Sequence, residues 1–347
     1  MRFGRIQRHK KLLLQMTVKD LIKRTVVRSG VLQAAGRLRG PSAAILMYHS
    51  VMEDPRSQED YLGETILSQG VFRQQIELLA RRFRPTSLDQ VEQFVNGKGK
   101  IPDRAVVVTF DDGYTDNYEI AAPVLNELGV PATFYATVDC VDRRTLPWPA
   151  RLRFCFRNTK EKTWADSSGK IWPLSSNEER ESALLSSCDE CCQLTGAVQE
   201  KYVASVANEL ETQVPVDSGA LMMNYDQLRA LVTQGHIVGS HTMTHPNMAY
   251  INADVMRQEM IESKRRLEQE LKTPVLHFAY PCPALSPHWT EETIAASREI
   301  GYATAVTTNG GLARQGDNPL RLRRIGCRET VEALQWSLEC AFAGYLR

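Results

Sequence analysis

Residues 105–113 read Ala-Val-Val-Val-Thr-Phe-Asp-Asp-Gly, an apolar run that ends in two carboxylates and a glycine. Such a run, rich in β-branched residues, predicts a strand that is buried on both faces, as in a parallel sheet. In parallel α/β folds ligands gather beyond the carboxyl ends of the strands, which is where Asp111 and Asp112 lie. Because Asp and Gly also cluster in ordinary turns, this segment alone does not establish a site.

Similar short apolar runs recur along the chain and alternate with helical patterns. They cover residues 43–48, 132–137, 237–239, 275–279, 303–306 and 320–325. Between them, capping boxes at Ser87-x-x-Gln90 and Asn224-x-x-Gln227 indicate helix starts, and an amphipathic helix is predicted over 253–271. With 105–110, these runs predict seven strands of a parallel α/β barrel or sheet.

Residues 150–220 interrupt this alternation, because they are polar, charged and only weakly periodic. They predict a helical insertion between two barrel strands. The insertion is either a lid over a site or a surface elaboration without a catalytic role.

Size and charge bound the remaining organisation. A chain of 347 residues, 43% hydrophobic and 24% charged, can form one barrel-type domain, and a net charge of +1 gives no reason to expect a nucleic-acid partner. Residues 1–40 contain eleven Lys/Arg and one acid, whereas the rest contains 31 basic and 40 acidic residues. The sequence therefore predicts a basic amphipathic N-terminal arm, 1–40, followed by the barrel, 41–347.

The arm does not resemble a secretion signal, because its longest apolar run is Leu12-Leu13-Leu14, and no segment is apolar enough for a transmembrane helix. Leu14, Val18, Leu21 and Leu32 fit an amphipathic helix that either contacts an anionic membrane or is solvated or docked on the core. We expect a cytoplasmic protein, working at the inner face of the membrane. Eight scattered cysteines fit reduced thiols in that compartment, and the cluster at 188–192 lacks a second Cys/His pair that would indicate zinc.

A second motif lies far downstream, where residues 239–246 read Gly-Ser-His-Thr-Met-Thr-His-Pro. His241 and His245 are four residues apart, a spacing that can bring both imidazoles to one ion. No acid follows the first histidine as it does in zincins, so a metal hydrolase built on this pair must take its base from Asp111 or Asp112. Together the two motifs offer three ligands to a divalent metal and one spare carboxylate.

These motifs carry a family resemblance. Thr109-Phe110-Asp111-Asp112-Gly113 and His241-Thr242-Met243-Thr244-His245 resemble the first two motifs of the polysaccharide deacetylases, the NodB homology domain of carbohydrate esterase family four. Pro131-Ala132-Thr133-Phe134-Tyr135 is similar to the next strand of that family, and the resemblance covers about residues 43–330 except the insertion. It implies a distorted (β/α)7 barrel.

The resemblance also implies roles for the motif residues. Asp111 becomes the general base, and Asp112, His241 and His245 become the ligands of a divalent metal. Zinc is the favoured ion, with Co²⁺ or Ni²⁺ as alternatives.

The third family motif is altered here. Residues 278–283 read Phe-Ala-Tyr-Pro-Cys-Pro, so Ala279 stands where many members have the arginine that orients the base. This version resembles the branch that acts on poly-N-acetylglucosamine. Cys282 aligns with the tyrosine whose backbone N–H helps to hold the oxyanion. The further substrate-binding candidates are Tyr280, Pro281, Tyr114 and Arg323, and Arg323 or Arg324 is the candidate for the missing arginine.

The general acid is also in an unusual position. The late Leu-x-His motif of the family is not visible, because no histidine follows His288. In the poly-N-acetylglucosamine branch the domain is circularly permuted and a Tyr-His near its start supplies the acid, which Tyr48-His49 matches. His49 is therefore the candidate acid, and a structural histidine at a strand end is the alternative.

The resemblance implies a hydrolase that removes N-acetyl groups from an amino-sugar polysaccharide or oligosaccharide and releases acetate, in envelope or exopolysaccharide biosynthesis. Its partner is an N-acetylated glycan. Because the third motif is altered and the C-terminal acid is missing, a catalytically silent sugar-binding or scaffold protein of a polysaccharide assembly is the alternative.

Overall fold

The apolar run at 105–110 forms strand β5 (Ala105–Phe110), all six residues of which are buried. The structure is a computed structural model that describes residues 18–53, 66–214 and 221–345. The other strands of its large sheet are β1 (Ala43–Tyr48), β4 (Arg84–Pro85), β6 (Ala132–Ala136), β9 (Ile237–Ser240), β10 (His277–Ala279), β11 (Thr304–Gly310) and β12 (Leu322–Gly326). All seven expected strands are present, and the short β4 is an addition.

The sheet closes on itself as a parallel barrel. Its order is β1-β12-β11-β10-β9-β6-β5, and β5 pairs back to β1 from Ala43↔Ala105 to Tyr48↔Phe110. Every described pairing in this sheet is parallel, and β4 joins at the start of β5. The carboxyl ends of all seven strands therefore meet at one rim.

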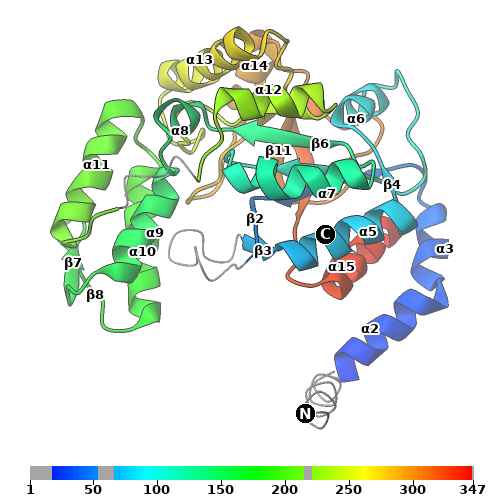
Figure 1. Cartoon of the computed structure of the whole chain (residues 1–347), viewed down its shortest axis with the longest axis horizontal. Coiled ribbons are helices and arrows are strands. Elements are labelled where there is room, and N and C mark those ends of the chain that lie inside the picture. Colours follow the sequence, from blue (N-terminus) through cyan, green and yellow to red (C-terminus); the bar gives the residue numbers. More distant parts are fainter. Residues whose placement is uncertain (1–17, 54–65, 215–220, 346–347) are drawn as a thin grey trace.

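Helices enclose the barrel (Figure 1). They are α5 (Gln69–Arg82), α6 (Leu88–Val95), α7 (Ala122–Glu127) after a π-helical turn η3 (Asn117–Ala121), α8 (Val138–Arg143), α12 (Tyr225–Thr233), α13 (Ala253–Leu271), α14 (Glu291–Ile300) and α15 (Val331–Ala343). The capping boxes at Ser87 and Asn224 form as expected. The short elements β2 (Ser50–Met52), β3 (Ile66–Ser68) and η5 (Pro319–Arg321) complete the frame.

Alternation along the strands separates two packed layers. Val106 and Val108 of β5 belong to the large cluster beneath the surrounding helices, whereas Ala105 and Val107 belong to a smaller cluster that α6 residues complete. In β12, Leu322 shares the smaller cluster and Ile325 the larger one. The parity of a residue in its strand therefore decides which layer it reaches.

The insertion is a lobe beside the barrel, drawn in green in Figure 1. It consists of α9 (Trp148–Asn158), the antiparallel hairpin β7 (Thr163–Ala165) and β8 (Ile171–Pro173), α10 (Asn177–Cys191) and α11 (Gly196–Glu209). These elements share a hydrophobic core of their own, and Cys188, Cys191 and Cys192 are buried free thiols within it. This placement accounts for the three cysteines without a metal.

The N-terminal arm divides into two helices, α2 (Val18–Ser29) and α3 (Val31–Arg37). Helix α3 docks on α15: Leu32 is buried, and a Cβ on Gly36 would lie 3.4 Å from the Phe342 backbone. In contrast, Leu21 and Ile22 of α2 remain more than half exposed. Leu14 and the Val18 side chain lie outside what is described, and none of the described helices combines the length and apolarity of a membrane span.

Candidate metal centre and active site

Two adjacent carboxylates leave the end of β5 and stay buried, with Asp111 2% and Asp112 8% exposed. Asp111 continues the row of Val107 and Thr109 toward the barrel interior. Asp112 takes a φ of 76° and Gly113 a φ of 92°, so the chain turns sharply at the rim. This turn separates the two carboxylates, as expected for residues with different roles.

The two histidines follow β9 on a tight loop. Thr242 and His245 have φ values of 70° and 63°, and the Thr242 hydroxyl accepts a hydrogen bond of 2.9 Å from the His245 backbone N–H. The buried carboxylate of Glu259, on α13, accepts the backbone N–H groups of Met243 and Thr244, each at 2.9 Å. A side chain of a distant helix therefore holds this loop, and the local sequence pattern did not reveal it.

The loop places both imidazoles beside Asp112. Asp112 Oδ1 lies 3.5 Å from His241 Nε2 and 3.2 Å from His245 Nε2. Among the described residues, these three form the one group of His, Cys, Asp or Glu donors close enough together to bind a metal ion. Two bonds of about 2.0–2.1 Å at a tetrahedral angle separate their ligand atoms by about 3.3 Å, so the spacing fits zinc.

The hydrogen bonding of these residues also fits a metal. His241 Nδ1 donates to the Ala279 carbonyl oxygen at 2.8 Å, which leaves the Nε2 lone pair directed at Asp112. Burial lowers the pKa of His241 to about 4, so the ring is neutral, the form that binds metal, at neutral pH. The buried Asp112 Oδ1 accepts no hydrogen bond from any described group. A cation would satisfy that oxygen.

The second carboxylate has a different partner. Arg324 Nη1 and Nη2 each donate to one oxygen of Asp111 at 2.7 Å, and the arginine side chain is fully buried. Arg324 Nε also donates to the Thr307 carbonyl oxygen at 3.0 Å. Burial acts to raise the pKa of Asp111, but the charge of Arg324 and its hydrogen bonds outweigh it and hold this pKa below its ordinary value. The carboxylate is thus ionised and fixed in orientation.

The expectation that Arg323 belongs to the site is wrong. Arg323 is exposed and lines a separate cavity with Gly311 and Trp289, on the other side of β12. Strand alternation is the reason, because Arg324 has the same parity as Leu322 and points inward while Arg323 points outward. Arg324 therefore supplies the cation beside Asp111 that the third motif, with Ala279, does not supply.

A cavity of about 290 Å³ opens over the two carboxylates. His49, Tyr114, Cys282, Pro283 and Thr308 contribute to its walls. The Asp112 charge and burial together raise the pKa of the Tyr114 hydroxyl well above its ordinary value, burial being the larger cause. The cavity thus brings the candidates from β1, β5, β9 and the loop after β10 to one place.

Two other candidates do not line this cavity. The Tyr280 ring is buried in the large core cluster, and its hydroxyl lies 2.8 Å from Ser297 Oγ and donates to the Leu320 carbonyl oxygen at 3.1 Å. Pro281 is buried and is not among the residues that line the cavity. The expectation of substrate contact fails for these two side chains, because the third motif turns toward the rim only at Cys282.

Comparison with known proteins gives this geometry a family. The family model for polysaccharide deacetylases matches residues 98–163 and 194–305, slightly more than half of the chain. The chain belongs to the polysaccharide deacetylase family. YxkH of Bacillus subtilis strain 168, which is named for the same family, is 21% identical over 226 residues, 65% of this chain and 52% of YxkH. The chain therefore spans about half the length of that relative.

Solved structures agree on the fold of this deacetylase-family chain. The deacetylase PplD of Streptococcus pyogenes matches with a TM-score of 0.57 at 19% identity, over 86% of this chain and 98% of PplD. IcaB from Ammonifex degensii matches with a TM-score of 0.56 at 19% identity, over 88% of this chain and 97% of IcaB. At this identity they establish the NodB-like, distorted (β/α)7 barrel.

The inserted lobe of this family member forms part of the site. The family match omits residues 164–193, but α9 at the start of the lobe lines the cavity with Pro149, Ala150 and Arg153. Trp148 Nε1 donates to the His245 carbonyl oxygen at 2.9 Å. The beginning of the insertion is thus a wall of the site and contacts a candidate ligand, which a purely peripheral elaboration would not do.

Two residues that the sequence reasoning missed hold the segment of His49. The buried Asp116 accepts the Ser50 hydroxyl at 2.5 Å and the Val51 backbone N–H at 3.0 Å, and Asn117 Nδ2 donates to the His49 carbonyl oxygen at 2.6 Å. Burial raises the pKa of Asp116 to about 7 against these hydrogen bonds. The Asp-Asn pair that begins three residues after Gly113 was the signal available in the sequence. We call Asp116 and Asn117 the β1 clip.

Replacing Asn117 with alanine is expected to loosen the β1 clip. It leaves the half-buried His49 carbonyl oxygen without this donor, which costs about 0.5–1.5 kcal/mol of the free energy of unfolding. With His49 as the candidate general acid, a shift of about 1 Å in its ring is expected to lower kcat for acetate release by up to about 10²-fold. Metal content, measured by elemental analysis, is expected to stay unchanged. Asn126→Ala, which removes an exposed bond to Gln234, is the matched control, and an equal kcat loss there would contradict the assignment.

Proposed function

We propose that this chain hydrolyses N-acetyl groups on an amino-sugar polysaccharide or oligosaccharide and releases acetate, with a divalent metal on Asp112, His241 and His245. The observation that carries the proposal is that the adjacent carboxylates of Asp111 and Asp112 have different partners. One faces two imidazole nitrogens, and the other is held by a buried arginine beside them. Family membership and the acetate in the PplD structure support the same reaction class.

A divalent ion at these ligands lowers the pKa of a water and polarises the acetamide carbonyl when it is bound. Asp111 accepts the proton of the attacking water, and Arg324 keeps its carboxylate ionised and oriented. The backbone N–H of Cys282, at the cavity, donates to the developing oxyanion. His49 delivers a proton to the departing amine, which is otherwise a poor leaving group.

The alternative of a silent sugar-binding protein rested on the missing arginine of the third motif and on the missing C-terminal acid, for which His49 is the candidate replacement. Arg324 reaches Asp111 from another strand with two charge-assisted hydrogen bonds, so the base retains an orienting cation. The arrangement therefore favours an enzyme over a silent scaffold.

The biological setting belongs to the proposal as well. An envelope or exopolysaccharide glycan fits the family, and the excess of basic residues in 1–40 favours work in the cytoplasm at the inner face of the membrane. We expect zinc as the native ion, with Co²⁺ or Ni²⁺ as substitutes.

The direct test is acetate release from N-acetylglucosamine oligomers. We expect release by the metal-loaded chain, loss of at least about 10²-fold after chelation, and recovery on adding Zn²⁺ or Co²⁺. Metal content is measured on the same samples. Glycan binding without release, across several metals and acceptors, would favour the silent scaffold instead.

A further inference from the structure

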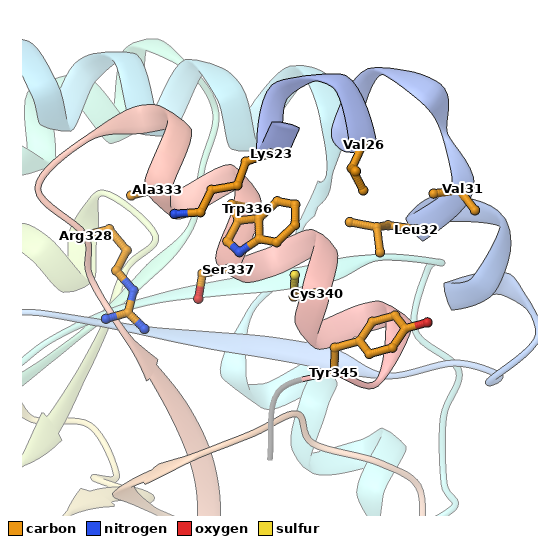
Figure 2. Close-up of a pocket in the computed structure, with 10 residues that line it drawn as sticks. All are labelled: Lys23, Val26, Val31, Leu32, Arg328, Ala333, Trp336, Ser337, Cys340 and Tyr345. Atoms are coloured by element: carbon orange, nitrogen blue, oxygen red, sulfur yellow. The ribbon is translucent and has the colours of Figure 1, made fainter. Parts of the chain in front are cut away.

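An apolar hollow outside the catalytic site lies between the N-terminal helices and α15. Its volume is about 820 Å³, within the range of small-molecule sites. Figure 2 shows Val26 and Leu32 on one wall and Trp336 and Cys340 on the facing wall, with Tyr345 at one end. We call this hollow the α2–α15 groove.

The charges of the groove have one sign. Lys23 and Arg328 line it, and no carboxylate does so among the described residues. Glu332 lies nearby on α15, but Arg24 pairs with it at 2.9 Å. An apolar slot with two cations and no lining acid is complementary to an amphiphile with an anionic head.

The groove continues into an exposed apolar surface. Leu21, Ile22 and Val31 are 58%, 56% and 56% exposed, and Tyr345 is 70% exposed. Helix α2, which carries Leu21 and Ile22, projects away from the barrel (Figure 1). Exposed aliphatic residues among lysines and arginines, with aromatic residues at the boundary, are typical of segments that lie in a membrane interface.

We infer that the α2–α15 groove binds an anionic phospholipid of a bilayer, with an acyl chain against Leu32 and Trp336 and the phosphate against Lys23 and Arg328. Binding of lipid does not require catalysis, so this inference and the proposed deacetylase activity can fail separately.

The end of the groove at Arg328 is connected to the catalytic cavity through a backbone hydrogen bond. Arg328 follows Cys327, whose backbone N–H donates to the Met47 carbonyl oxygen at 2.9 Å, and Met47 lines the catalytic cavity. The cationic end of the groove is therefore joined to the rim by a few residues.

The test uses the full chain and vesicles of phosphatidylcholine with or without phosphatidylglycerol. We expect sedimentation with the anionic vesicles only, weakened by salt. The double variant Ile22→Ser/Lys23→Glu and the single variant Arg328→Glu are each expected to lower the partition constant by at least about tenfold. The matched control is Ile171→Ser/Lys201→Glu, an exposed pair on the insertion, which is expected to bind like the wild type.

A second readout locates the lipid. Brominated acyl chains quench nearby tryptophan, so the wild type should lose a fluorescence component that Trp336→Phe lacks. Vesicle binding that leaves this component unquenched, or that survives Arg328→Glu at full strength, would overturn the groove as the lipid site. Absence of binding together with self-association in sedimentation equilibrium would assign the face to a second copy. The Asp111→Asn variant should bind vesicles like the wild type.

Discussion

Replacing Asp111 with asparagine is expected to lower kcat for acetate release by about 10²–10⁴-fold, the range for loss of a general base. The isosteric amide cannot accept the water proton at neutral pH. The three candidate ligands are untouched, so one metal per chain should remain by elemental analysis. Rates are compared per metal-loaded molecule, since the change also weakens the pairing with Arg324.

The companion variant Asp112→Asn separates the two carboxylates. It removes the charged oxygen that faces His241 and His245, so metal content should fall with activity. Loss of metal in Asp111→Asn, with retention in Asp112→Asn, would show that the two roles are exchanged.

Replacing Arg324 with methionine is expected to lower the free energy of unfolding by about 3–5 kcal/mol, because it strands the Asp111 carboxylate in a buried site. Deacetylation should fall as well, since the unpaired base becomes protonated more easily and loses its orientation. Denaturant unfolding and acetate release are measured on the same preparations.

Arg323→Met is the matched control for that experiment. The side chain is exposed and sits one position earlier in the same strand, so stability and activity should change little. The double variant Asp111→Leu/Arg324→Met removes both charges and should recover most of the lost stability while remaining inactive. Failure of the double variant to recover would show that Arg324 stabilises the barrel mainly through its bond to Thr307.

Much of the barrel could be predicted from local pattern. Apolar runs such as 105–110 and 132–137 form buried parallel strands because both faces of a parallel strand must be covered. The candidate metal ligands could also be predicted, since strand ends in such folds converge on one rim. Asp112 is about 130 positions from the two histidines in sequence, yet its Oδ1 lies 3.5 Å from His241 Nε2 and 3.2 Å from His245 Nε2.

The incorrect expectations share a cause. Tyr280 and Pro281 were grouped with Cys282 by proximity in the sequence, yet the Tyr280 hydroxyl bonds to Ser297 and Leu320 in the core. Adjacent residues diverge in direction, so nearness along a motif does not place side chains in one cavity. For the same reason Arg323 and Arg324 point to opposite sides of β12. Leu322 points inward, so the alternation along the strand would have predicted that Arg324, and not Arg323, also points inward.

Short-range pattern was therefore sufficient for the strands and their parallel arrangement, because periodicity and strand ends are local properties. The family resemblance was needed to assign Asp112 rather than Asp111 to the metal. The residues that orient the side chains of the site could be identified only from the tertiary structure. Arg324 on Asp111, Glu259 beneath the histidine loop, the β1 clip and the wall built by α9 all join segments that are distant in sequence. Such contacts arise only when the barrel closes, since closure brings side chains from different strands and helices to a common rim.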